Sequence, residues 1–151
     1  MRRVLHLVAS MFYRPPLLQV AALCLRGVGH QTHVLLIRSL DSNRWILPKG
    51  WPMNGKTLAE AAEIEAWEEA GVKGTVNPQA IGIFSTKKRR ASGLRQNSDV
   101  HVFELRVTSE SQDYPEAEQR KARWFTMTDA IDRLREPELR ALIQRHLLQD
   151  H

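Results

Sequence analysis

Apolar residues run continuously through two neighbouring segments near the start of the chain. Residues 17–25 read LLQVAALCL and residues 32–38 read THVLLIR, with the turn-like RGVGHQ between them. Short apolar runs bounded by turn residues predict buried strands, and this spacing predicts that the two strands pair as a hairpin. A shorter strand is predicted at residues 44–48, and three more at residues 80–86, 99–108 and 122–126.

The pattern becomes helical between residues 57 and 71. Thr57 is a candidate N-cap, and Glu60 stands three positions later, which is the spacing of a capping box. The helix is expected to run to about Ala70 and to end at Gly71. Two short helices, separated by Pro137, are predicted near the C-terminus.

The order of these elements predicts the fold class and the domain organisation. Most strands lie outside strand–helix–strand units, which favours an α+β fold with a mixed sheet. The sequence contains no repeat, low-complexity run or linker. We therefore expect one domain over residues 1–151, with an N-terminal extension at residues 1–16 and a core at about residues 17–148.

Five glutamates lie within ten residues of the predicted helix, and they divide into two groups. At about 100° per residue, Glu65, Glu68 and Glu69 share a sector of the helix with small apolar residues such as Ala62. Glu60 and Glu63 fall on the opposite side, where solvated charges are ordinary. The first group therefore replaces positions that would otherwise face the core.

Three carboxylates on one helix face repel one another, and burying them is costly without a counter-charge. A hard divalent cation meets that need, because carboxylate oxygens suit Mg²⁺ or Mn²⁺. From spacing alone, a solvated acidic helix face is the alternative interpretation. The surrounding motif decides between them.

Composition and charge indicate the class of partner and the cellular compartment. The chain of 151 residues is 42% hydrophobic, carries a formal net charge of +5 and has a pI near 9.8, which favours a polyanionic partner such as a phosphorylated small molecule or nucleic acid. Cys24 is the only cysteine, and no Cys/His spacing fits structural zinc, so a reducing, cytoplasmic location is expected. The apolar run near the N-terminus is too short to span a bilayer, so no membrane partner is expected.

The segment from Gly50 to Val72 resembles the box of the Nudix hydrolases, G-x5-E-x7-R-E-U-x-E-E-x-G-U, in which U is aliphatic. Further segments that resemble this family are RWILP at residues 44–48, EEAGVKGT at 68–75 and RKARWFTMTDAI at 120–131. The chain is most similar to the diphosphoinositol polyphosphate and diadenosine polyphosphate phosphohydrolases. This resemblance implies the Nudix fold, an α/β/α sandwich with a mixed central sheet.

The resemblance also implies roles for the box residues. Glu65, Glu68 and Glu69 are expected to bind Mg²⁺, or Mn²⁺ as the alternative ion, with help from the Gly50 carbonyl. Glu68 is in addition the expected general base. The box departs from the family at two positions: Lys56 replaces its first glutamate, and Ile64 replaces an arginine that is thought to orient the helix carboxylates.

Basic residues outside the box are candidates for binding substrate phosphates, because arginine and lysine are the side chains that recognise them. The segment KKRRASGLR at residues 87–95 matches a basic loop of the resembling hydrolases. Glu118 lies where several members carry a further acid, and Trp45 and Trp124 are expected in the core, with base stacking as the alternative. The candidates for phosphate binding are Arg38, Arg44, Lys49, Lys56, Lys88, Arg89, Arg90, Arg120 and Lys121.

These observations predict a Mg²⁺-dependent enzyme that cleaves a phosphoanhydride bond. The substrates expected from the resemblance are a dinucleoside polyphosphate, a diphosphoinositol polyphosphate or a related nucleoside diphosphate derivative. An RNA 5′-end pyrophosphohydrolase is one alternative, favoured by the basic charge. A degenerate domain that binds a nucleotide without cleaving it is the other, motivated by Lys56 and Ile64.

Overall fold

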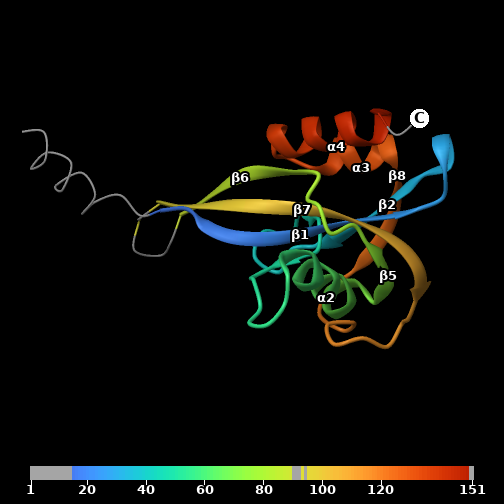
Figure 1. The fold of residues 1–151 in the computed structure, drawn as a ribbon, viewed down its shortest axis with the longest axis horizontal. Helices are drawn as coiled ribbons and strands as arrows, with labels where there is room; N and C mark the ends of the chain where they lie inside the picture. The colour runs from blue at the N-terminus through green and yellow to red at the C-terminus, as the bar shows by residue number, and fades with distance from the viewer. Residues whose placement is uncertain (1–14, 90–92, 94, 150–151) are drawn as a thin grey trace, which may run out of the picture.

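The computed structural model describes residues 15–89, 93 and 95–149, which form a mixed sheet flanked by helices (Figure 1). The strands are β1 (Leu17–Arg26), β2 (His33–Arg38), β3 (Trp45–Ile46), β4 (Lys49–Gly50), β5 (Val72–Val76), β6 (Gly82–Arg89), β7 (Arg95–Glu110) and β8 (Ala122–Thr126). The helices are the 3₁₀ turn η1 (Gly29–Gln31) and α2 (Leu58–Ala70), α3 (Met127–Arg133) and α4 (Pro137–Gln149). The sheet runs in the order β3-β2-β1-β7-β5, while β4 pairs with β1, β6 with β7 and β8 with β2.

Helices cover both faces of the sheet, with α2 on one side and α3 and α4 on the other (Figure 1). Alternate residues of β1 divide between the two cores: Val20 and Ala22 pack with the alanines of α2, while Ala21 and Leu23 pack with α3 and α4. A strand buried on both faces needs a continuous apolar sequence. This arrangement confirms the predicted α+β class and the α/β/α sandwich.

The long strand β7 lies beside β1 and runs parallel to it, in register from Leu17 opposite Ser98 to Leu25 opposite Arg106. The predicted hairpin is also present, because β1 pairs antiparallel with β2 at Leu25 and Val34. The first strand therefore lies between a neighbour close in sequence and one about 80 residues away.

Two strand predictions need correction. The strand predicted at residues 44–48 is shorter, because only β3 forms there, and a second short strand, β4, follows Pro48. The prediction also missed β5, whose sequence VKGTV contains Gly74 at an irregularity in the pairing with β7. At Gly74 a Cβ atom would collide with the backbone of Arg106, so the glycine that obscured the strand pattern is required by the close approach of β7.

Helix α2 begins and ends as the sequence predicts. The Thr57 hydroxyl accepts a hydrogen bond from the Glu60 amide at 3.1 Å, and the Glu60 carboxylate accepts one from the Thr57 amide at 2.9 Å. Gly71 ends the helix in the left-handed conformation, with φ of 71°. The helix contacts the sheet through buried alanines, which allow it to approach β1 and β4 closely. No described helix is long and apolar enough to cross a membrane.

Candidate active site

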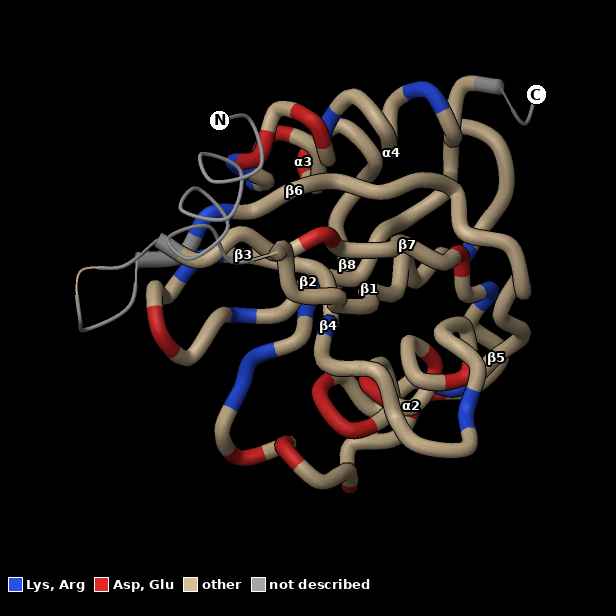
Figure 2. Tube along the Cα trace, turned by 60° about the vertical axis from the view of Figure 1, so that its left-hand side comes forward, with Lys and Arg blue, Asp and Glu red and all other residues tan. Residues whose placement is uncertain are grey.

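The acidic pair Glu65 and Glu69 lies where α2 packs against β4. In Figure 2, α2 lies beside β4, with acidic positions in red. Glu69 is only 2% exposed, and its Oε1 accepts a hydrogen bond from the backbone amide of Lys49 at 3.2 Å. The carboxyl group of Glu65, one helical turn earlier, is hydrogen-bonded to that of Glu69. The helix face predicted to carry buried acids therefore carries them.

Burial is the main cause of unusual acidity in this pair. Burial, followed by the hydrogen bond to Glu65, raises the pKa of Glu69 to about 9, although the positive charge of Arg120 opposes the rise. Burial also raises the pKa of Glu65, while its hydrogen bond to Glu69 has the opposite effect. Two carboxyl groups in contact hold a proton that neither would hold at neutral pH in water.

Gly50 provides the space for Glu65. A Cβ atom at this position would lie closer than 3.0 Å to the carboxyl carbon and both oxygens of Glu65. The backbone of Gly50 is an ordinary strand pairing with Val20, so the glycine is needed for the approach of the carboxylate and not for an unusual backbone angle.

The guanidinium of Arg120 contacts Glu69. Its terminal Nη1 lies 3.5 Å from Glu69 Oε2, and its Nε donates a hydrogen bond to Glu116 Oε1 at 2.9 Å. The Glu116 amide in turn donates to the carbonyl of Glu68 at 3.0 Å. Sequence reasoning proposed Arg120 as a phosphate contact and considered Glu118 as the extra acid, but the acid beside the pair is Glu116. No local sequence pattern identifies Glu116, because it lies in the irregular segment between β7 and β8.

The chemistry of these donors fits a hard divalent cation, because Glu65 and Glu69 bring two oxygen ligands together and their like charges need a cation when both are ionised. Glu68 is half-buried on the same side of α2 and raises the pKa of Glu65 through its charge. As the described side chains stand, no three His, Cys, Asp or Glu residues are grouped closely enough to surround an ion. The third carboxylate therefore stands beside the pair, not within it.

The predicted phosphate contacts occupy several different places. Arg38 donates to the Asn43 carbonyl and lies over the ring of Trp45, 4.6 Å from its centre, and Arg44 pairs with Glu136 at 3.7 Å. Arg38 is thus engaged at the turn between β2 and β3, whereas Arg44 reaches across to the segment between α3 and α4. Lys49 adjoins the acidic pair through its backbone, and Lys121 is exposed next to Arg120.

The basic loop is only partly described. Arg90 lies outside the described residues, and Lys88 and Arg89 are described as backbone of β6, where Arg89 pairs with Arg95 of β7. The loop predicted from KKRRASGLR is thus largely the end of the β6–β7 hairpin.

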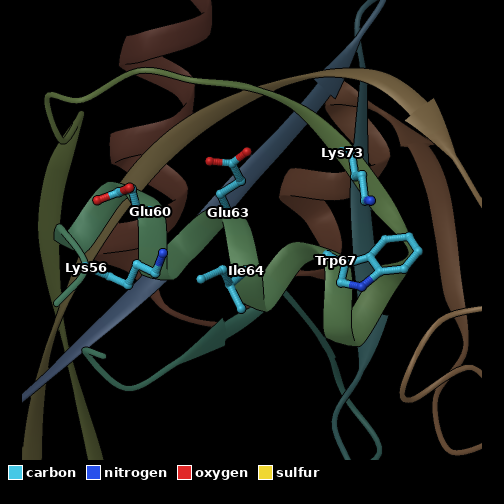
Figure 3. A pocket seen from close by; sticks show the side chains of 6 residues that line it. All are labelled: Lys56, Glu60, Glu63, Ile64, Trp67 and Lys73. Carbon is cyan, nitrogen blue, oxygen red and sulfur yellow. The ribbon is translucent and has the colours of Figure 1, made fainter. Parts of the chain in front are cut away.

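Lys56 lies apart from the acidic pair. Together with residues along the outer side of α2, Lys56 lines a shallow pocket (Figure 3). Glu65 and Glu69 are not among the residues that line this pocket. Lys73 lies over the ring of Trp67 there, 4.5 Å from its centre. The other lining residues are Glu60, Glu63 and Ile64. The two groups of glutamates predicted from the helical wheel therefore face different surroundings.

A row of side chains across the sheet leads away from Glu65. Gly50 is paired with Val20, Val20 with His101, and His101 with Ile83, so these positions lie on one face of the sheet. His101 is half-buried and Ile83 is 53% exposed. Two strand spacings place His101 about 10 Å from Gly50. Neither residue is predictable from a local pattern, because their position beside the acids depends on strand register.

One exposed aromatic side chain adjoins the site. Trp51, directly after Gly50, is 53% exposed, whereas Trp45 packs edge-on against Phe125, with ring centres 5.0 Å apart. Trp124 is held by its indole N–H bond to Glu110. Trp51 is thus the exposed tryptophan that directly follows Gly50 in the sequence.

Comparison with known proteins identifies the family. The NUDIX domain model matches residues 16–149. The chain is 31% identical to Arabidopsis thaliana Nudix hydrolase 12, mitochondrial, over 106 residues, which are 68% of this chain and 52% of that protein. It is 32% identical to mouse diphosphoinositol polyphosphate phosphohydrolase 3-alpha over 115 residues, which are 75% of this chain and 66% of that protein.

Among solved structures, a C. elegans Ap4A hydrolase superposes with a TM-score of 0.59 at 19% identity, covering 87% of this chain and 96% of that one. At this identity the likeness concerns the fold.

The first curated relatives are longer proteins, and this chain spans between about half and two thirds of their length. The domain match over residues 16–149, together with the α/β/α sandwich, shows that the chain belongs to the Nudix domain family.

Proposed function

We propose that the chain is a Mg²⁺-dependent hydrolase that cleaves a phosphoanhydride bond. The observation that carries this proposal is the contact between the half-buried carboxyl group of Glu65, which lies against Gly50, and the buried carboxyl group of Glu69. Two carboxylates in contact, one of them buried, are unfavourable without a strong reason. Binding a divalent cation is a sufficient one.

In this proposal Glu65, Glu68 and Glu69, with the Gly50 carbonyl, hold Mg²⁺, and Mn²⁺ is the alternative ion. When bound, the ion supplies neutralisation of phosphate charge and a lowered pKa for water. Glu68 is the proposed general base, because it is more exposed than Glu69 and can accept a proton from the attacking water.

The rest of the substrate is proposed to extend over the row that contains His101 and Ile83, with Trp51 beside the reacting phosphates. An exposed indole and an exposed isoleucine suit a planar base better than a ring covered with phosphates. This favours a nucleoside polyphosphate, such as a dinucleoside polyphosphate, over a diphosphoinositol polyphosphate. Lys49 and Lys121 are the proposed phosphate contacts nearest to the acidic pair.

Release of phosphate or nucleotide from a panel of substrates with Mg²⁺ tests the proposal. The panel contains a dinucleoside polyphosphate, a diphosphoinositol polyphosphate, a nucleoside diphosphate sugar and a 5′-triphosphorylated RNA. We expect turnover of the dinucleoside polyphosphate, lost in Glu68→Gln and retained in Glu63→Gln. Trp51→Ala is expected to raise KM for nucleotides more than for the inositol compound. Turnover of the inositol compound alone would contradict the proposed substrate class.

The RNA 5′-end alternative has one supporting observation. The hairpin end at Arg89 and Arg95 lies six residues along β7 from His101, which is about 20 Å in a strand. An elongated substrate could reach both the acids and this end, whereas a compact one could not. Cleavage of the RNA in preference to the dinucleotides would select this alternative. Binding of nucleotides without any cleavage would instead support a degenerate, ligand-sensing domain.

A further inference from the structure

Glu69 is fixed from three directions. Its Oε1 accepts the hydrogen bond from the Lys49 amide at 3.2 Å, its Oε2 lies 3.5 Å from Arg120, and the group is hydrogen-bonded to Glu65. The Lys49 amide is held within β4, and Glu65 belongs to the same helix as Glu69. Of the three contacts, only that of Arg120 comes from outside β4 and α2.

Arg120 is itself anchored to the end of α2. Its Nε donates to Glu116 Oε1 at 2.9 Å, and its backbone amide donates to the Glu116 carbonyl at 3.2 Å. The Glu116 amide then donates to the carbonyl of Glu68 at 3.0 Å. That carbonyl lies in the last turn of α2, where helical carbonyls lack partners within the helix. The segment between β7 and β8 is thus joined to the helix that carries the acids.

The guanidinium has little freedom to serve a ligand instead. The side chain of Arg120 is 16% exposed, and two of its nitrogens face carboxylates of Glu69 and Glu116. A guanidinium can hold two carboxylates in a fixed geometry because its donors lie in one plane. Ile64, within α2, can make no such contact with the neighbouring acids.

From these contacts we propose that Arg120, held by Glu116, is a positioning residue that sets the orientation of the Glu69 carboxylate. In this role it does not touch the substrate, which revises the phosphate contact predicted for Arg120. The inference rests on the proposed function, because the orientation of Glu69 matters to activity only if Glu69 holds the metal. The orientation of Glu69 by Arg120 does not itself depend on the proposed function.

The experiment compares wild type, Arg120→Gln, Arg120→Lys and Glu116→Gln, with Arg123→Gln as the matched control. Arg123 is an exposed arginine on the adjacent strand β8, away from these contacts. Crystal structures of the metal-free proteins are expected to show the Glu69 carboxylate displaced from the Lys49 amide in Arg120→Gln. The control should leave it in place. An unmoved Glu69 in Arg120→Gln would overturn the proposal.

Metal binding without substrate provides the second measurement. We expect the Mn²⁺ dissociation constant, measured by electron paramagnetic resonance, to rise about tenfold in Arg120→Gln, with part of the loss recovered in Arg120→Lys and a smaller loss in Glu116→Gln. Turnover should then show a lower kcat with KM within a few-fold of wild type. A raised KM with unchanged kcat and Mn²⁺ affinity would identify Arg120 as a substrate contact and overturn the proposal.

These measurements separate the two hypotheses. If wild type neither binds Mn²⁺ nor cleaves any substrate, the proposed function fails, and the metal-free crystal structures still decide whether Arg120 orients Glu69. If wild type cleaves its substrate and Arg120→Gln loses only thermal stability, the function stands and the positioning role is rejected.

Discussion

At the scale of single residues, the three acids of the inner face of α2 are expected to differ sharply from those of its outer face. We predict that Glu68→Gln and Glu69→Gln each lower kcat by about 10² or more, because each removes a proton acceptor or a metal ligand. Glu63→Gln should be nearly silent, since Glu63 lines the pocket on the other side. Steady-state kinetics with Mg²⁺ provide the test. Equal, modest losses at all three positions would show that the acids are ordinary solvated charges.

Gly50 allows the acidic pair to be disturbed without removing a charge. We predict that Gly50→Ala lowers kcat by about tenfold or more while the folded state is largely retained, because the atoms nearest to the added methyl are those of the Glu65 carboxyl group, at the end of a side chain, and not backbone. Kinetics and thermal unfolding, measured together, separate the two effects. Loss of cooperative unfolding would mean that the glycine serves the fold and not the placement of Glu65.

Individual site residues were predictable from the sequence to different degrees. Glu65 and Glu69 follow from helical periodicity, because both belong to one regular element. Glu116 and Ile83 do not, since the first lies in an irregular segment and the second reaches the site through pairing across three strands. Local patterns carry no information about which distant strands become neighbours.

At the scale of elements, the β6–β7 hairpin allows the length of the substrate to be tested. We predict that neutralising Arg89 and Arg90 together raises KM more for a dinucleotide with five or six phosphates than for a nucleoside diphosphate sugar. The backbone of Arg89 lies about 20 Å along the strands from the row containing His101, beyond the reach of a compact substrate. KM for both substrates at two salt concentrations is the measurement, because salt screens exposed charges. A uniform change would indicate a general effect of charge or stability.

The elements also show where sequence patterns succeed. The capping box and Gly71 define α2 within a residue, because each end depends on local hydrogen bonds. The strand β5 was missed for the opposite reason: its Gly74 is explained only by the approach of Arg106 from β7. The apolar run of β1 was recognised because Val20 to Leu25 are all buried, on alternating faces, and all apolar.

At the scale of the whole molecule, the acidic pair makes stability depend on pH. The pKa of Glu69 is raised to about 9 in the folded protein, above its value in the unfolded chain, so the folded state binds more protons between about pH 4.5 and 9. The contribution of Glu69 to the free energy of unfolding is therefore fully present below about pH 4.5 and decreases as pH rises toward 9. We predict that the melting temperature of the metal-free protein falls over this range.

Two comparisons test the assignment of this pH dependence to Glu69. Glu69→Gln should flatten the decline, and Mg²⁺ in excess should oppose it, because the ion binds the ionised carboxylates of the folded state only. Differential scanning fluorimetry at several pH values is sufficient. A decline of equal slope in wild type and Glu69→Gln would assign the pH dependence to other groups.

The parallel pairing of β1 with β7 has a consequence for how the chain folds as it is synthesised. Leu17 to Leu25 are buried against Ser98 to Arg106, so the first strand cannot acquire its partner until residues beyond 106 have left the ribosome. Until then β1 is an exposed apolar strand with only β2 and β4 as neighbours. The entropy cost of closing the long chain segment between β1 and β7 comes before any stabilisation from the pairing of these two strands. During translation the central strand of the finished sheet is thus exposed apolar surface of the kind that favours aggregation, and substitutions that destabilise its pairing with β7 should lower yield before they alter activity.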